Sequence, residues 1–138
     1  MRSWESATPK ETAAQVVLWL PALMDCPCDQ NLLERALSPA ENHLLMDEGE
    51  AIAWLALIEG ECGWTLDVAT KRKGKWLTRS VIDQAYEIIF KDREFVILEN
   101  SKGAALKFAL HMGANPIMIP GKKDTYLLSR MSFKGRLN

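Results

Sequence analysis

The sequence has little cysteine and no long apolar run. Its three cysteines, Cys26, Cys28 and Cys62, are odd in number, which fits a reducing compartment such as the cytoplasm better than a disulfide framework. One residue separates Cys26 from Cys28, whereas zinc sites use two to four, so no metal site is expected. No apolar run reaches the roughly 18 residues of a membrane span, and no hydrophobic signal segment is found.

The sequence also lacks a large net charge. The formal net charge is −1, so no nucleic-acid partner is expected. The charges are nevertheless unevenly distributed, because residues 1–69 hold 3 Lys/Arg and 12 Asp/Glu, whereas residues 70–138 hold 14 and 6. An acidic half and a basic half are expected in a domain that binds an anionic cofactor on one side and an amine on the other. They equally suit an assembly with complementary faces, such as a homodimer.

The remaining composition is that of a single globular domain spanning residues 1–138. The chain is 48% hydrophobic and 25% charged, which is enough for a sizeable core. Apolar alternation predicts strands at 2–6, 43–47, 51–58, 64–69 and 94–98, with a closing hairpin of 116–119 and 125–131. Capping signals and helical periodicity predict helices from Pro9 and at 30–37, 76–91 and 102–112. The expected fold is α/β, a mixed, mostly antiparallel, twisted sheet of six to seven strands flanked by about four helices.

The most informative stretch is the turn between the 64–69 strand and the 76–91 helix. Four cations, Lys71, Arg72, Lys73 and Lys75, surround Gly74 there. A helix start leaves backbone N–H groups without partners and carries the positive end of the helix dipole. The turn therefore has the features of an anion site that suits a pyrophosphate.

This turn resembles the phosphate-binding segment of the GCN5-related N-acetyltransferases, which reads Val-x-Pro-x-x-Arg-Gly-x-Gly/Ala. Val68, Lys73 and Gly74 fall in register, whereas Thr70 replaces the proline and Trp76 replaces a small residue. The fold predicted above is the one that this resemblance implies. More narrowly, the chain looks like the small acetyltransferase-like proteins of tailed phages.

A second landmark of that family, Asn-x-x-Ala-x-x-Leu-Tyr, is matched weakly on the 102–112 helix. Ala105 matches the alanine and Phe108 stands for the leucine, while Lys102 occupies the asparagine position. Ala109 occupies the position of the tyrosine, which is the usual general acid of the family. An alanine cannot protonate a thiolate.

The resemblance implies acetyl-CoA as co-substrate and an amine of a small molecule or protein as acceptor. Backbone groups of the splayed strand would hold the pantetheine, and the basic turn would hold the pyrophosphate. The cofactor-binding residues it implies are Val68, Ala69, Thr70, Lys71, Arg72, Lys73, Gly74, Lys75, Trp76, Asn100 and Lys102.

The proton-handling groups are less closely specified by the sequence. With position 109 unable to act, the acid is sought at Tyr126 or Tyr86, the two tyrosines of the chain. The base is sought among Glu59, Glu61 and Asp67, which lie on or beside the splayed strand. The catalytic set we predict is Asp67, Glu61 and Tyr126. The two histidines give no Ser-His-Asp or Cys-His pairing.

Two functions follow from these residues. The first is an acyl-CoA-dependent N-acetyltransferase of the cytoplasm, or of the host cytoplasm for a phage protein. The second is a catalytically silent relative that acts as a binding or assembly factor, against a virion or host protein. Trp76 separates them, because its indole either obstructs the pyrophosphate pocket or turns into the core.

Overall fold

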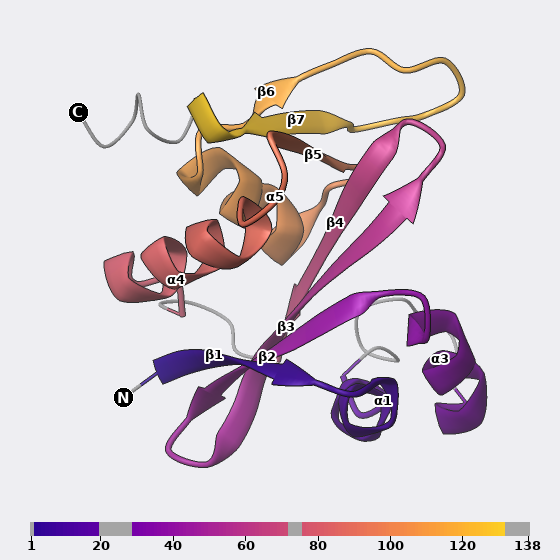
Figure 1. Ribbon diagram of the computed structural model, residues 1–138, viewed down its shortest axis with the longest axis vertical. Helices are drawn as coiled ribbons and strands as arrows, with labels where there is room; N and C mark the ends of the chain where they lie inside the picture. The colour runs from indigo at the N-terminus through magenta and orange to yellow at the C-terminus, as the bar shows by residue number, and fades with distance from the viewer. Residues whose placement is uncertain (1, 20–28, 72–75, 132–138) are drawn as a thin grey trace.

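The computed structural model describes residues 2–19, 29–71 and 76–131. Within these ranges a seven-stranded sheet runs in the order β1-β2-β3-β4-β5-β7-β6 (Figure 1). β4 and β5 pair in parallel, and the other neighbours pair antiparallel. The predicted mixed, mostly antiparallel sheet is therefore confirmed.

Local capping signals set the N-terminal helices. After β1 (Arg2–Ala7), α1 (Pro9–Val16) begins with the predicted capping box, in which Thr8 and Glu11 exchange hydrogen bonds. Helix α3 (Gln30–Leu37) begins at Asp29, whose Oδ1 accepts from the N–H of Asn31 at 2.8 Å.

The centre of the sheet is a meander of three strands. β2 (Glu41–Asp47) and β3 (Glu50–Gly60) are joined by a tight turn in which Glu48 and Gly49 both have positive φ. β3 is buried from 51 to 57 and turns back into β4 (Gly63–Thr70). It is therefore a central strand covered on both faces, as its continuous apolar run predicts.

The C-terminal half completes the sheet. Its elements are α4 (Arg79–Ile89), β5 (Phe95–Leu98), α5 (Gly103–His111), β6 (Asn115–Pro116) and β7 (Tyr126–Ser129). The predicted closing hairpin forms from β6 and β7, although β6 is shorter than expected.

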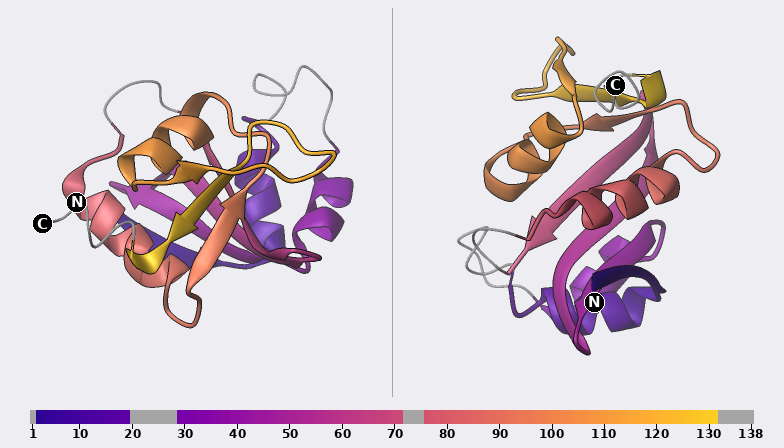
Figure 2. Two further views of the ribbon diagram at one scale, coloured as in Figure 1. Left: turned by 90° about the horizontal axis from the view of Figure 1, so that it is seen from above. Right: turned by 90° about the vertical axis from the view of Figure 1, so that its left-hand side faces the viewer.

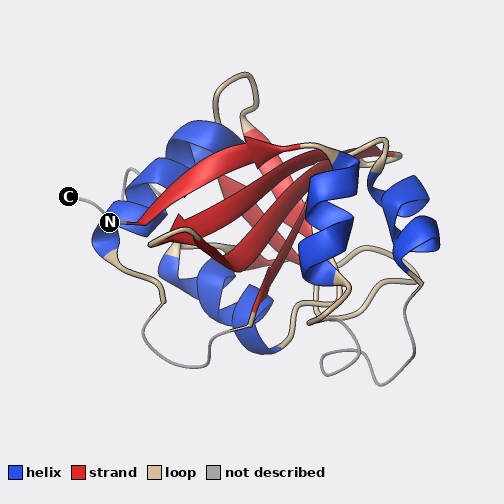
Figure 3. Cartoon of the chain, turned by 90° about the horizontal axis from the view of Figure 1, so that it is seen from below, coloured by secondary structure: helices blue, strands red, loops and turns tan. Residues whose placement is uncertain are grey.

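Helices cover both faces of the sheet (Figure 3). Leu55 and Leu57 of β3 belong to the core on the α4 and α5 side. Trp54 and Ala56, one position out of phase, belong to the core on the α1 and α3 side. Of the helices that the structure describes, none is long and apolar enough to cross a membrane.

Two helix starts differ from the prediction. α4 begins at Arg79 and not at Trp76, because Thr78 is the N-cap and accepts from the N–H of Val81 at 3.3 Å. α5 begins at Gly103 and not at Lys102, because Lys102 is its N-cap, although its side chain makes no cap bond.

Candidate active site

Strands β4 and β5 meet near the start of β4 and then separate. Thr65↔Ile97 is the pair that joins them in the described part of the chain, whereas β4 stays paired with β3 as far as Thr70. The right-hand view of Figure 2 shows the two strands diverging. One edge of β4 therefore presents backbone groups to an opening instead of to a neighbouring strand.

A cavity of about 590 Å³ lies at this opening, within the size range of pockets for small organic ligands. The run 66–70 of β4 forms one side, and the segment 99–105, from the end of β5 to the first turn of α5, forms another. The remaining wall is apolar and consists of Leu33, Ala36 and Leu37 of α3 with Trp54 and Ile58 of β3. A larger hollow of about 690 Å³ between α1 and α3 is bordered mainly by exposed side chains.

Asp67 and Glu99 bring two carboxylates to the cavity. Asp67 lies opposite Ala56 in the ladder and so faces the α3 side of the sheet. Its side chain is exposed to the solvent that enters the cavity, yet protein atoms surround the carboxyl and displace much of its hydration. Burial therefore raises the pKa of Asp67, and the like charge of Glu99 raises it further. A carboxylate with a raised pKa in a cleft is a candidate general base.

Several of the cofactor-binding residues expected from the sequence line the same cavity. Besides Asp67, the cavity wall includes Val68, Ala69, Thr70, Asn100 and Lys102. The hydroxyl of Thr70 donates to the carbonyl of Ile52 at 2.8 Å and so helps to hold the end of β4 against β3.

The basic turn is described only at its two ends. The ammonium of Lys71 forms an ion pair with Glu50 of β3. Arg72, Lys73, Gly74 and Lys75 lie outside the described residues, so the proposed pyrophosphate site there stays a prediction. The residue that follows them, Trp76, is 2% exposed, and its ring stacks on Phe108 with centroids 6.4 Å apart. The indole of Trp76 therefore packs into the core, which is the second of the two alternatives considered for it.

The three expected catalytic residues are not gathered together. Asp67 lies in the cavity, whereas Glu61 lies exposed in the β3–β4 turn. Tyr126 of β7 packs against the core on the α5 side and does not line the cavity. Ala109 is fully buried, so a tyrosine ring at that position would have no space.

Sequence reasoning missed Glu99 and the apolar wall of α3. Glu99 was not among the candidate residues, although its position directly after β5 was a usable signal. In a sheet with parallel neighbours, residues at adjacent carboxyl ends of strands share one edge. The α3 wall had no comparable signal, because its contribution depends on how α3 packs over the sheet.

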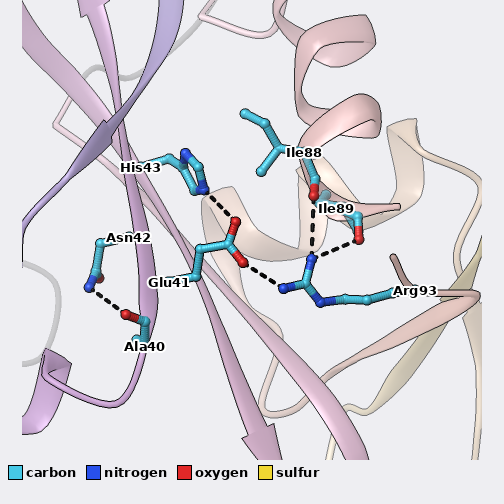
Figure 4. A network of polar contacts seen from close by, with 7 residues as sticks. All are labelled: Ala40, Glu41, Asn42, His43, Ile88, Ile89 and Arg93. Carbon is cyan, nitrogen blue, oxygen red and sulfur yellow. Dashed lines mark hydrogen bonds and ion pairs between the residues drawn. The ribbon is translucent and has the colours of Figure 1, made fainter. Parts of the chain in front are cut away.

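A second polar cluster ties the start of β2 to the end of α4 (Figure 4). Glu41 accepts from His43 at 3.0 Å and from Arg93 at 2.5 Å. Arg93 also donates to the carbonyls of Ile88 and Ile89 and covers the ring of Trp64 at 4.2 Å. Burial alone would raise the pKa of Glu41, but the hydrogen bonds and charges of His43 and Arg93 outweigh it and lower that pKa. This cluster is a structural clamp.

Comparison with solved structures identifies the architecture. The aminoglycoside acetyltransferase AAC(6')-Ib, solved with coenzyme A and kanamycin, superimposes with a TM-score of 0.76 at 13% identity, covering 100% of both chains. FdhC, a nucleotide-linked sugar GNAT, gives 0.67 at 12% identity over 98% of this chain and 90% of that one. The chain has the fold of the GCN5-related N-acetyltransferases (GNATs). An acetyltransferase from Thermus thermophilus agrees, with a TM-score of 0.66 at 16% identity over 92% of this chain and 96% of that one.

The likeness is one of GNAT fold rather than of sequence. No protein-family model matches this sequence, and no curated protein is significantly similar to it. In the described ranges no three His, Cys, Asp or Glu side chains form a group that could hold a metal ion.

Proposed function

We propose that the chain is an acyl-CoA-dependent N-acetyltransferase that transfers an acetyl group from acetyl-CoA to an amine. One observation supports this most strongly. Asp67, with a raised pKa, lies in a cavity at the point where the parallel strands β4 and β5 separate. That arrangement offers a base beside an opening where a thioester can enter between two strands.

The reaction needs a base and a leaving group. Asp67 accepts one proton from the ammonium of the acceptor, which frees the nitrogen lone pair. The nitrogen attacks the thioester carbonyl carbon, so that a C–N bond forms and the C–S bond breaks with its electron pair on sulfur. The second nitrogen proton passes to the thiolate or to solvent. A thiol pKa near 8.5 makes this thiolate a tolerable leaving group without a dedicated acid.

The residues present fit acetyl-CoA as co-substrate. Extended amides of pantetheine can pair with the open edge of β4 at 66–70, as an added strand would. Lys102 provides a cation on the cavity wall at the start of α5, where the helix dipole is positive. A fold shared with CoA-bound acetyltransferase structures adds support.

A silent scaffold is the second candidate, and one observation favours it. No tyrosine lines the cavity in the part of the chain that the structure describes, and the position expected for the acid is Ala109 in the core. In this alternative the chain binds a protein partner and does not catalyse acetyl transfer.

Calorimetry with acetyl-CoA and a transfer assay distinguish the two. The assay follows CoA release and the mass of the N-acetyl product with a mixed panel of amines. Asp67→Asn should lower kcat/KM by about 10²–10⁴-fold at pH 7 and by less at high pH, where free amine needs no base. Asp83→Asn, an exposed carboxylate on α4, is the control. CoA binding without transfer to any amine would reject the enzyme and favour the scaffold.

A further inference from the structure

The cavity is divided between an apolar wall and a polar side that holds the carboxylates of Asp67 and Glu99. On the α3 side the wall consists of Leu33, Ala36, Leu37 and Ile58 with the ring of Trp54. The indole N–H of Trp54 donates to Asn42 Oδ1 at 3.1 Å. Because that donor is already engaged, Trp54 offers a ligand its apolar ring.

The charged side chains that line the described part of the cavity differ in their partners and in the sign of their charge. Glu99 lies 3.4 Å from the ammonium of Lys122, which partly neutralises it. Lys102 is a cation and repels an ammonium. Asp67 is therefore the carboxylate that remains for a cationic ligand among the described residues of the wall.

We propose that the acceptor is a small primary amine with one ammonium group and an apolar, aryl or alkyl body. This rests on the proposed function and specifies its acceptor. The ammonium lies at Asp67, and the body packs on the wall formed by α3 and Trp54. A polyamine or an aminoglycoside would place further ammonium groups against this wall. Its described residues offer no carboxylate besides Asp67 and the Lys122-paired Glu99, and burial of an unpaired charge is strongly unfavourable.

A lysine side chain of a protein fits less well than a free amine. Its stem is apolar, but its peptide groups are polar. A peptide group that came to lie against the apolar wall would lose hydration without a hydrogen-bond partner among the side chains of that wall. Burial of an aryl ring against the same surface carries no such penalty.

The test compares acetyl transfer to 2-phenylethylamine, 1,4-diaminobutane, kanamycin and a lysine-containing peptide by the full chain. We expect kcat/KM for 2-phenylethylamine to exceed the other three by at least about tenfold, the discrimination that a well-fitted apolar group provides. Preference for a diamine, for kanamycin or for the peptide overturns the acceptor class while leaving the transferase intact.

Two variants of α3 test the wall itself. Ala36→Glu adds a carboxylate to the cavity, whereas Leu32→Glu adds the same charge to the same helix at a side chain that is 62% exposed and does not line the cavity. Because Ala36 is also exposed, neither change should unfold the chain. Ala36→Glu should lower kcat/KM for 2-phenylethylamine about tenfold and raise it for 1,4-diaminobutane, while Leu32→Glu leaves both unchanged. Equal behaviour of the two variants overturns the proposal.

Binding measurements distinguish an incorrect acceptor class from an incorrect assignment of transferase activity. Transfer to the mixed panel of amines tests the transferase, and acetyl-CoA titration tests binding of its co-substrate. If no amine is acetylated, calorimetry of 2-phenylethylamine with the parent chain and with Ala36→Glu still tests the wall. Binding by the parent that Ala36→Glu abolishes supports the inference, and absence of binding by the parent overturns it.

Discussion

Asp67 ionises less readily in the folded chain than in the unfolded chain, because the cavity removes hydration and Glu99 adds a like charge. Its contribution to stability is therefore fully present below the unfolded pKa, near 3.9, and is lost as the pH rises through the folded pKa. Asn at this position cannot ionise. Asp67→Asn should have a higher Tm than the parent at pH 7 to 8, with a difference that vanishes as the pH falls toward 4.

The matched control is Asp83→Asn on the exposed face of α4. Its Tm difference from the parent should show no comparable growth with pH. Thermal unfolding measured from pH 4 to 8 decides between the outcomes. A destabilised Asp67→Asn at neutral pH would contradict the raised pKa of Asp67 in the folded chain.

Glu41 should show the opposite pH dependence. Its folded pKa is lowered by His43 and Arg93, so its stabilisation is present above the unfolded pKa of about 4.3 and is lost as the pH falls through the folded pKa. Glu41→Gln should lower the free energy of unfolding by about 1 kcal/mol at pH 7, a modest value because the side chain is 42% exposed. Urea unfolding at pH 7 and pH 4 measures it. Glu87→Gln is the exposed control, and equal losses in both variants would reject the clamp.

At the scale of elements, the start of α4 depends on one side chain. Thr78 Oγ1 accepts from the N–H of Val81, and removal of such a cap typically costs about 1 kcal/mol. Thr78→Ala should lower Tm by several degrees, whereas Thr78→Ser keeps the oxygen and should remain near the parent. If the Ala and Ser variants have the same Tm, the hydroxyl of Thr78 does not stabilise the start of α4.

The first residue of a helix could be predicted where neighbouring residues in the sequence set it. It could not be predicted where a contact with a distant segment sets it. The capping box at Thr8 and the cap at Asp29 lie within four residues of their partners. The start of α5 is different. The N–H groups of Asn100 and Ser101 bond to carbonyls of Lys123 and Asp124, and Asn100 has φ +52°. A loop more than 20 residues away thus sets that start, and no local pattern records it.

At the scale of the whole molecule, the sheet could be predicted and much of the site could not. Alternation and turns specified the meander, because each strand pairs with its neighbour in sequence. The sequence offered Glu59, Glu61 and Asp67 as candidates for the base, with nothing in their spacing to choose among them. The folded sheet separates them, because Asp67 lies on the α3 face of β4 and Glu61 lies in the turn. The Arg93–Glu41 clamp joins residues 52 positions apart and was not predictable from either segment alone.

The central claim is that acyl-CoA enters between β4 and β5. Hydrogen exchange of the full chain with and without acetyl-CoA tests it most directly, because amides that pair with a ligand or become buried exchange more slowly. We predict slower exchange in peptides that cover 66–70 and 99–105, with no change in peptides that cover β1 and α1. Unchanged exchange at 66–70 and 99–105 with saturating acetyl-CoA, or protection confined to β1 and α1, would contradict the claim.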